Sequence, residues 1–165
     1  MTSGPQQVGI NAVSIATTTN IGYQFVNWTA TAGITIANAN NTSTTITATK
    51  AGTVTANFKA QPSTTVYLKT TANWKDANAR FAIYYWGANA QNGWVNMTEV
   101  DCNRDYFKGE IPYGSTGFNF VRMNPNALAN NWDNDWNQAG NISVPTDSKN
   151  CFTITNDHWG EQNPT

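Results

Sequence analysis

Charged side chains are scarce in this sequence of 165 residues. They make up 12% of the chain, with nine Lys and Arg against ten Asp and Glu, and the formal net charge is −1. Because nucleic-acid phosphates require a basic surface, this balance argues against DNA or RNA as a partner. Solubility must instead come from uncharged Asn and Thr, which suit exposed β-sheet faces and the turns between strands.

Long apolar runs are also missing, as is a basic segment followed by an apolar one at the start. We therefore expect no membrane insertion, and we expect any secretion signal or anchor to lie outside this sequence. Only two cysteines occur, Cys102 and Cys151, which is too few for a cysteine-based metal cluster. They allow either one disulfide or two unpaired thiols, and the sequence leaves both open.

Apolar residues at helical spacing are almost absent. Short alternating or β-branched runs are separated instead by Gly, Asn, Pro and Ser, so the chain is predicted to be all-β. In the first sixty residues the expected strands are 13–18, 23–31, 34–38, 44–50 and 53–59. We expect Tyr23, Phe25 and Trp28 to form much of a small core there.

The composition changes at residues 60–65, AQPSTT, a Pro- and Ser-containing stretch typical of a short linker. Six of the seven Trp follow it. We therefore predict a small β repeat module at 1–60, a linker at 61–65 and a second domain at 66–165.

The second domain is predicted to be a β-sandwich, because seven short strands are spaced by turns. These strands are expected at 65–70, 80–86, 94–100, 106–112, 118–124, 141–145 and 151–155. Alternation along RFAIYYW separates its side chains into two rows on opposite faces. The core row is Phe81, Ile83 and Tyr85, and the opposite row is Ala82, Tyr84 and Trp86.

Several aromatic rings can share one surface on that opposite face. Trp94 follows the loop GANAQNG, so it can fold back beside Trp86 as a hairpin neighbour. Exposed rings suit sugars, because the C–H faces of a pyranose desolvate well against them while nearby polar groups meet its hydroxyls. The alternative is that these rings pack against a loop or the other domain.

The first segment carries a recognisable pattern, GYQFVNWTAT followed by a terminal TVTANFK strand. Over about residues 8–59 it resembles the bacterial repeat modules related to the internalin B-repeat. That resemblance implies an Ig-like extracellular spacer, of the kind found in tandem on bacterial surface proteins, and no chemistry.

The second segment carries VYLKTTANWKDANARFAIYYWGANAQNGWVNM, YFKGEIP, FNFVRMNPN and WNQAGNISVP in order. From about residue 65 to 155 it resembles starch-binding carbohydrate-binding modules of the family 26 type. The resemblance implies noncatalytic binding of α-1,4-linked glucose by aromatic stacking and a Gln hydrogen bond. It nominates Tyr84, Trp86, Trp94 and Gln138 as ligand-binding residues, and a register slip of one residue would exchange Tyr84 for Tyr85.

The stretch NNWDNDWNQ contains two neighbouring carboxylates, Asp133 and Asp135. Calcium needs six to eight oxygen ligands from a suitable loop, and glycoside hydrolysis needs two carboxylates in a cleft; neither setting is indicated here. We interpret the stretch as a turn or short helical loop. Its residues Trp132 and Trp136 would anchor it to the sandwich edge, and one ring could extend a glycan surface.

Three further residues are interpreted without a ligand role. Trp74 and Trp159 are expected to be structural, and the lone His158 has no nucleophile motif nearby, so we expect it to be solvated.

The sequence thus predicts a noncatalytic, extracellular or cell-surface bacterial protein segment with no catalytic residues, cofactor or metal. Its expected partner is starch or malto-oligosaccharide, and further linked domains are expected in the parent protein. The alternative is an adhesion or scaffolding module that binds protein through the same aromatic patch.

Overall fold

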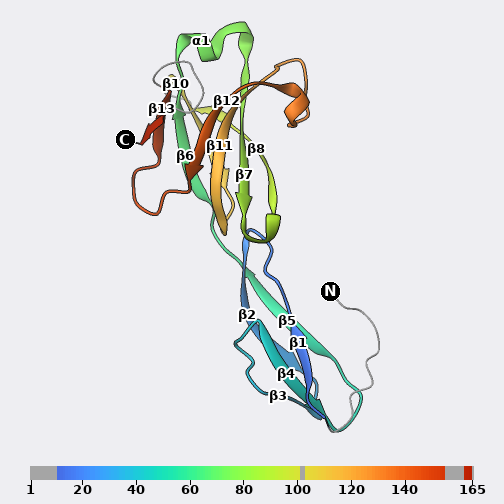
Figure 1. Ribbon diagram of the computed structural model, residues 1–165. Coiled ribbons are helices and arrows are strands. Elements are labelled where there is room, and N and C mark those ends of the chain that lie inside the picture. Colours follow the sequence, from blue (N-terminus) through green and yellow to red (C-terminus); the bar gives the residue numbers. More distant parts are fainter. Residues whose placement is uncertain (1–10, 101–102, 155–161, 165) are drawn as a thin grey trace. The chain divides into compact units, whose positions relative to one another are not determined.

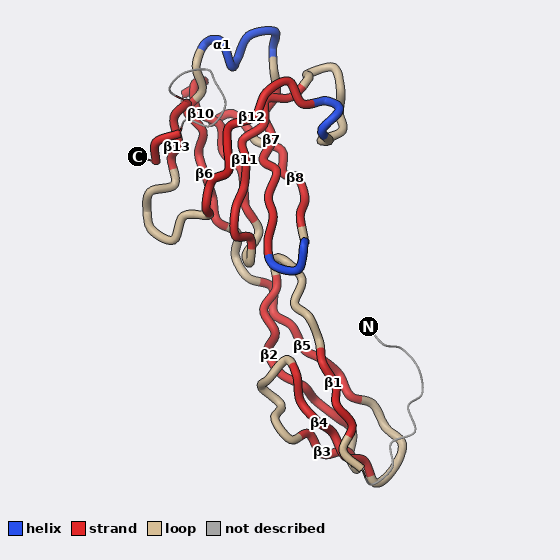
Figure 2. The backbone as a smooth tube through the Cα atoms, viewed as in Figure 1, coloured by secondary structure: helices blue, strands red, loops and turns tan. Residues whose placement is uncertain are grey.

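The computed structural model describes residues 11–100, 103–154 and 162–164. The chain divides into two compact units, residues 1–61 and 62–165, and both are built mostly of strands (Figures 1 and 2). The predicted all-β fold is confirmed. The last strand of the first unit ends at Ala60 and the first strand of the second begins at Thr64.

The first unit contains strands at all five expected positions. They are β1 (Val13–Ala16), β2 (Tyr23–Ala30), β3 (Ile34–Ile36), β4 (Ser43–Ala48) and β5 (Val54–Ala60). β1, β4 and β3 form one antiparallel sheet in that order, and β2 pairs with β5 in a second antiparallel sheet (Figure 2). The alternating pattern was sufficient to locate these strands because each has one face turned inward.

Trp28 is the largest buried side chain of the first unit. Its indole Nε1 donates to the carbonyl oxygen of Asn41 at 2.8 Å, and its ring meets Phe25 edge-on at 5.8 Å between centroids. Tyr23 was expected in this core, but it is 49% exposed. It is the first residue of β2 and pairs with Ala60, the last of β5, so neither strand continues past it to cover its ring.

The second unit is a sandwich of two sheets. One sheet has the order β14-β13-β6-β10-β9 and the other β12-β11-β7-β8, and among these pairs β13 and β6 are parallel. The strands are β6 (Thr64–Lys69), β7 (Arg80–Gly87), β8 (Asn92–Asn96), β9 (Thr98–Val100), β10 (Asn103–Ile111), β11 (Ser115–Met123), β12 (Asp135–Ser143), β13 (Cys151–Ile154) and β14 (Gln162–Pro164).

The core of the second unit lies between these sheets. It is lined by Val66, Leu68, Ile111, Phe152 and Ile154 from one sheet and by Phe81, Ile83, Phe118, Phe120 and Ala139 from the other. A short helix, α1 (Ala72–Lys75), follows β6, and Thr71 caps it by accepting from the backbone N–H of Trp74. Trp74 is buried against this core, its ring parallel to Phe81 at 6.1 Å, which supports the structural role predicted for it.

Several strands differ from the sequence expectation. The segment 94–100 is not one strand, because it leaves the four-stranded sheet after Asn96 and joins the five-stranded sheet at Thr98. Met97, at the crossing, is buried in the core between the sheets. The strand expected at 141–145 begins earlier, at Asp135.

Candidate functional site

Aromatic rings gather on the outer face of the four-stranded sheet. Tyr84 of β7 and Trp94 of β8 lie directly opposite each other, with ring centroids 5.0 Å apart and planes inclined at 53°. Trp86 lies 6.1 Å from Tyr84, inclined at 38°. The structure therefore brings together the three aromatic residues that the sequence nominates.

The register of β7 is defined by what each side packs against. Tyr84 and Trp94 rest on a small outer cluster of Ala82, Val121 and Met123, whereas Tyr85 packs against the main core. Tyr84, and not Tyr85, therefore faces outward.

One detail of the expectation was wrong: in the β7–β8 ladder the partner of Trp94 is Tyr84, while Trp86 is paired with Asn92. The turn between the strands is shorter than assumed, because β8 already begins at Asn92.

Trp86 lies flat against the neighbouring strand, directly over Gly117 of β11. A Cβ atom at residue 117 would come within 2.4 Å of Cζ2 and 2.8 Å of Nε1 of this indole. Only glycine leaves room for the ring to lie along the sheet at this position. The ring is consequently held low on the sheet surface and is half-buried.

A fourth ring, Trp132, completes the cluster from outside the sheet. It belongs to a single 3₁₀ turn, Trp132–Asn134, in the loop that connects β11 to β12 (Figure 1). Its centroid lies 4.8 Å from Tyr84 and 4.7 Å from Trp94, with interplanar angles of 67° and 61°. We call these four rings, Tyr84, Trp86, Trp94 and Trp132, the aromatic cluster.

The loop that carries Trp132 is held by Arg80, the first residue of β7. Its Nε donates to the carbonyl oxygens of Asn124, at 3.2 Å, and Ala127, at 2.9 Å. Its Nη2 donates to the carbonyl of Ala129 at 2.8 Å, and its Nη1 to Oδ1 of Asn130. Partial burial lowers the pKa of this guanidinium, which still stays charged at neutral pH. One fixed cation therefore satisfies several loop oxygens at once.

Further bonds fix the same loop. Asn130 Nδ2 donates to Oδ1 of Asn96 on β8 at 2.9 Å, and the backbone N–H of Asn124 donates to the carbonyl of Asn134 at 2.9 Å. Asn131 caps the 3₁₀ turn through its side chain, which accepts from the N–H of Asn134 at 3.0 Å. The loop is therefore closed at its base and tied to the sheet edge.

Gln138, the fourth nominated residue, lies on β12 opposite Val121 and so faces the same side as the aromatic cluster. β12 is separated from β7 by β11, which places Gln138 roughly 10 Å from the rows of β7. The side-chain amide of Asn119, itself paired with Tyr84, lies 3.1 Å from Oε1 of Gln138. Gln138 therefore lies on the same face as the rings, with Asn119 between it and Tyr84.

The two carboxylates of the β11–β12 loop differ in their surroundings. Asp133 is exposed, whereas Asp135 is partly buried, and desolvation raises its pKa despite a backbone hydrogen bond from Asn137. Within the described residues no group of three or more His, Cys, Asp and Glu is placed to hold a metal ion. In the same residues no helix is long and apolar enough to cross a membrane.

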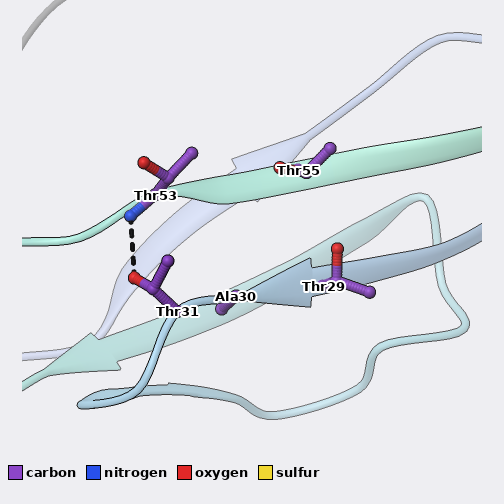
Figure 3. Close-up of a pocket in the computed structure, with 5 residues that line it drawn as sticks. All are labelled: Thr29, Ala30, Thr31, Thr53 and Thr55. Carbon is purple, nitrogen blue, oxygen red and sulfur yellow. Dashed lines mark hydrogen bonds between the residues drawn. The ribbon is translucent and has the colours of Figure 1, made fainter.

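The first unit has a shallow recess at one end of the β2–β5 pair (Figure 3). Thr29, Ala30, Thr31, Thr53 and Thr55 line it. The backbone N–H of Thr53 donates to Oγ1 of Thr31 at 3.0 Å, as Figure 3 shows. These side chains offer hydroxyl and methyl groups but no ring and no charge, so this recess has no chemistry comparable to the aromatic cluster.

Residues 1–62 match the family model of the divergent InlB B-repeat domain. The match supports the resemblance of the first segment to the B-repeat. Repeats of this type are noncatalytic and occur in bacterial surface proteins, which supports the predicted setting of the first unit. No curated protein matches the chain, and no solved structure matches it.

Three residues discussed from the sequence, Cys102, His158 and Trp159, lie outside the described residues. Cys151 begins β13, where it is paired with Tyr67 of β6.

Proposed function

We propose that the second unit binds α-1,4-linked glucan, as in starch and malto-oligosaccharides, without catalysing a reaction on it. The observation that carries the proposal is the position of the aromatic cluster. The sandwich already has a complete core between its sheets, and Tyr84, Trp86, Trp94 and Trp132 all lie outside it, on the opposite side of the four-stranded sheet. Tyr84, Trp86 and Trp94 are half-buried and Trp132 is 46% exposed, and rings gathered in this way on one outer face are typical of a recognition surface.

The inclination of the rings favours a curved ligand. Neighbouring planes in the cluster differ by 38° to 67°, so the rings do not form one flat platform. An α-1,4-linked glucan turns at each linkage, whereas a β-1,4-linked chain is extended and flat. Inclined rings can each meet a different sugar unit of a turning chain, which supports the resemblance to starch-binding modules noted in the sequence.

Polar groups beside the rings would orient the bound glucan chain. The amide of Gln138 lies on the same face, where the buried Asn119 contacts it, and an amide can both donate to and accept from sugar hydroxyls. In this account stacking supplies most of the affinity, and the hydroxyl contacts orient the chain. One such site is weak alone, so retention on a polysaccharide would depend on further linked modules acting by avidity.

The B-repeat in the same chain is consistent with a bacterial surface protein, where an accessory module of this kind would hold an amylolytic enzyme or the cell on its glucan. Retention of the chain on granular starch tests the proposal. We expect retention that soluble maltoheptaose abolishes and cellohexaose leaves unchanged. No retention on starch would reject the proposal and favour an aromatic interface for a protein partner.

A further inference from the structure

We infer that Trp132 is a working part of the glucan-binding surface and that Arg80 is the positioning residue that holds it there. The inference rests on the proposed function of the aromatic cluster. It extends the site from the three strands that carry the residues nominated by the sequence, β7, β8 and β12, to the loop between β11 and β12.

The packing of Trp132 differs from that of an anchoring side chain. A ring whose role is to fasten a loop is expected to be buried, as Trp74 is, but Trp132 remains 46% exposed while it contacts both Tyr84 and Trp94. Its plane rises from theirs at 67° and 61°. Trp132 thus forms a side wall, and a sugar unit of a turning chain can contact the wall and the sheet-bound rings together.

This wall is preorganised by hydrogen bonds that do not involve the rings. Arg80 donates to three loop carbonyls and to the side chain of Asn130, and Asn130 in turn donates to Asn96 of β8. A loop fixed before the ligand arrives loses less conformational entropy on binding, so the affinity is higher. Arg80 touches no ring of the cluster through these bonds and acts only through the loop.

A second tryptophan of the same loop region offers a matched control. Trp136, near the start of β12, is 41% exposed, close to the value for Trp132. Its ring is covered on one side by the guanidinium of Arg122, at 4.9 Å. Replacing it removes an indole of similar exposure without removing a ring of the aromatic cluster.

Calorimetric titration with maltoheptaose tests the inference on the full chain. We expect Trp132→Ala to lower the association constant about tenfold, the scale of one aromatic contact, and Trp136→Ala to leave it within about twofold. Trp132→Phe should restore most of the loss. An unchanged affinity in Trp132→Ala would overturn the inference, and so would a tighter one, because the ring would then be covering the site.

The role of Arg80 is tested by a double-mutant cycle. Arg80→Ala should weaken binding by about as much as Trp132→Ala, and the double variant should lose little more, because both changes remove the same contact. Arg80→Lys keeps the charge but not the planar fork, so it should rescue binding only in part. Independent, additive losses would overturn the positioning role.

A second variant and the wild-type titration complete this test. If Arg80→Ala fails to fold, Asn130→Ala removes only the side-chain bonds to Arg80 and Asn96, and the same non-additivity with Trp132→Ala is expected. If the wild type binds no maltoheptaose, the proposed function fails and the inference fails with it. If the wild type binds maltoheptaose and Trp132→Ala binds it equally well, the inference is rejected and the proposed function stands.

Discussion

Tyr84 and Trp94 lie directly opposite each other on adjacent antiparallel strands, and their rings contact each other at 5.0 Å while Trp132 contacts both. Tyr84 also contacts Trp86, so it is the one residue of the aromatic cluster that meets the other three. The surface is therefore a connected group of inclined rings. Its geometry depends on the β7–β8 register, on Gly117 beneath Trp86 and on the loop held by Arg80.

Gly117→Ala is expected to displace Trp86. The added Cβ would lie 2.4 Å from Cζ2 of the indole, so either the ring must lift or the strands must shift, at a cost of roughly 1–3 kcal/mol in the free energy of unfolding. Urea unfolding of the variant gives this value, and maltoheptaose affinity should fall as well.

Repeating Gly117→Ala in a Trp86→Ala background tests whether the clash with the indole causes this loss of stability. Without the indole the new methyl group has space, so its destabilising effect should almost disappear. An equal cost in both backgrounds would show that the glycine is needed for another reason.

Phe120→Ala is expected to destabilise the second unit strongly. Phe120 is fully buried and contacts Phe118 at 5.2 Å and Phe152 at 5.6 Å, so truncation leaves a cavity in the core and costs about 3–5 kcal/mol. Chemical denaturation followed by tryptophan fluorescence measures the loss. Leu128→Ala is the control, because Leu128 is 94% exposed and its removal should change stability by less than about 0.5 kcal/mol. Similar losses in both variants would contradict the described core.

Asp135→Asn is expected to stabilise the protein at neutral pH. Desolvation raises the pKa of this carboxyl, and no group in the described part of the chain hydrogen-bonds to its buried Oδ1. The folded state therefore binds the proton more tightly than the unfolded state, so wild-type stability falls as pH rises from about 4 through the raised pKa. The gain in stability from Asp135→Asn should be complete at pH values above the raised pKa and absent below about pH 3.5.

Stability curves of wild type, Asp135→Asn and Asp133→Asn against pH measure this effect. Asp133 is exposed on the same turn, so its variant should follow the wild type. A stabilisation by Asp135→Asn that does not depend on pH would show that ionisation of Asp135 is not its cause.

Much of the fold could be predicted from local patterns. The five strands of the first unit and the outward position of Tyr84 follow from alternation, because each strand buries one face. The change from one sheet to the other at Met97 could not be predicted from the sequence, because an apolar residue there continues the alternation of the preceding strand. Alternation reports which side is buried, and not which sheet a strand joins.

The sequence indicated that one ring of the stretch 130–138 could extend a glycan surface, but not that this ring would be Trp132 rather than Trp136. Loop 124–134 has no hydrophobic period, and its position depends on Arg80 bonding to backbone carbonyls more than forty residues away. Such bonds leave no pattern in side-chain types. Asn119 was missed for a similar reason, because it sits inside a predicted strand and only the pairing with Tyr84 brings it beside the rings.

The central claim is tested most directly by tryptophan fluorescence during titration with maltoheptaose, with cellohexaose as the control ligand, on wild type and Trp94→Ala. We predict a saturable change for the wild type with maltoheptaose only, and its loss in a Trp94→Ala variant that keeps the wild-type far-ultraviolet circular dichroism spectrum. No response of the wild type to maltoheptaose, with calorimetry also showing no binding, would contradict the account and leave the aromatic cluster without a glucan ligand.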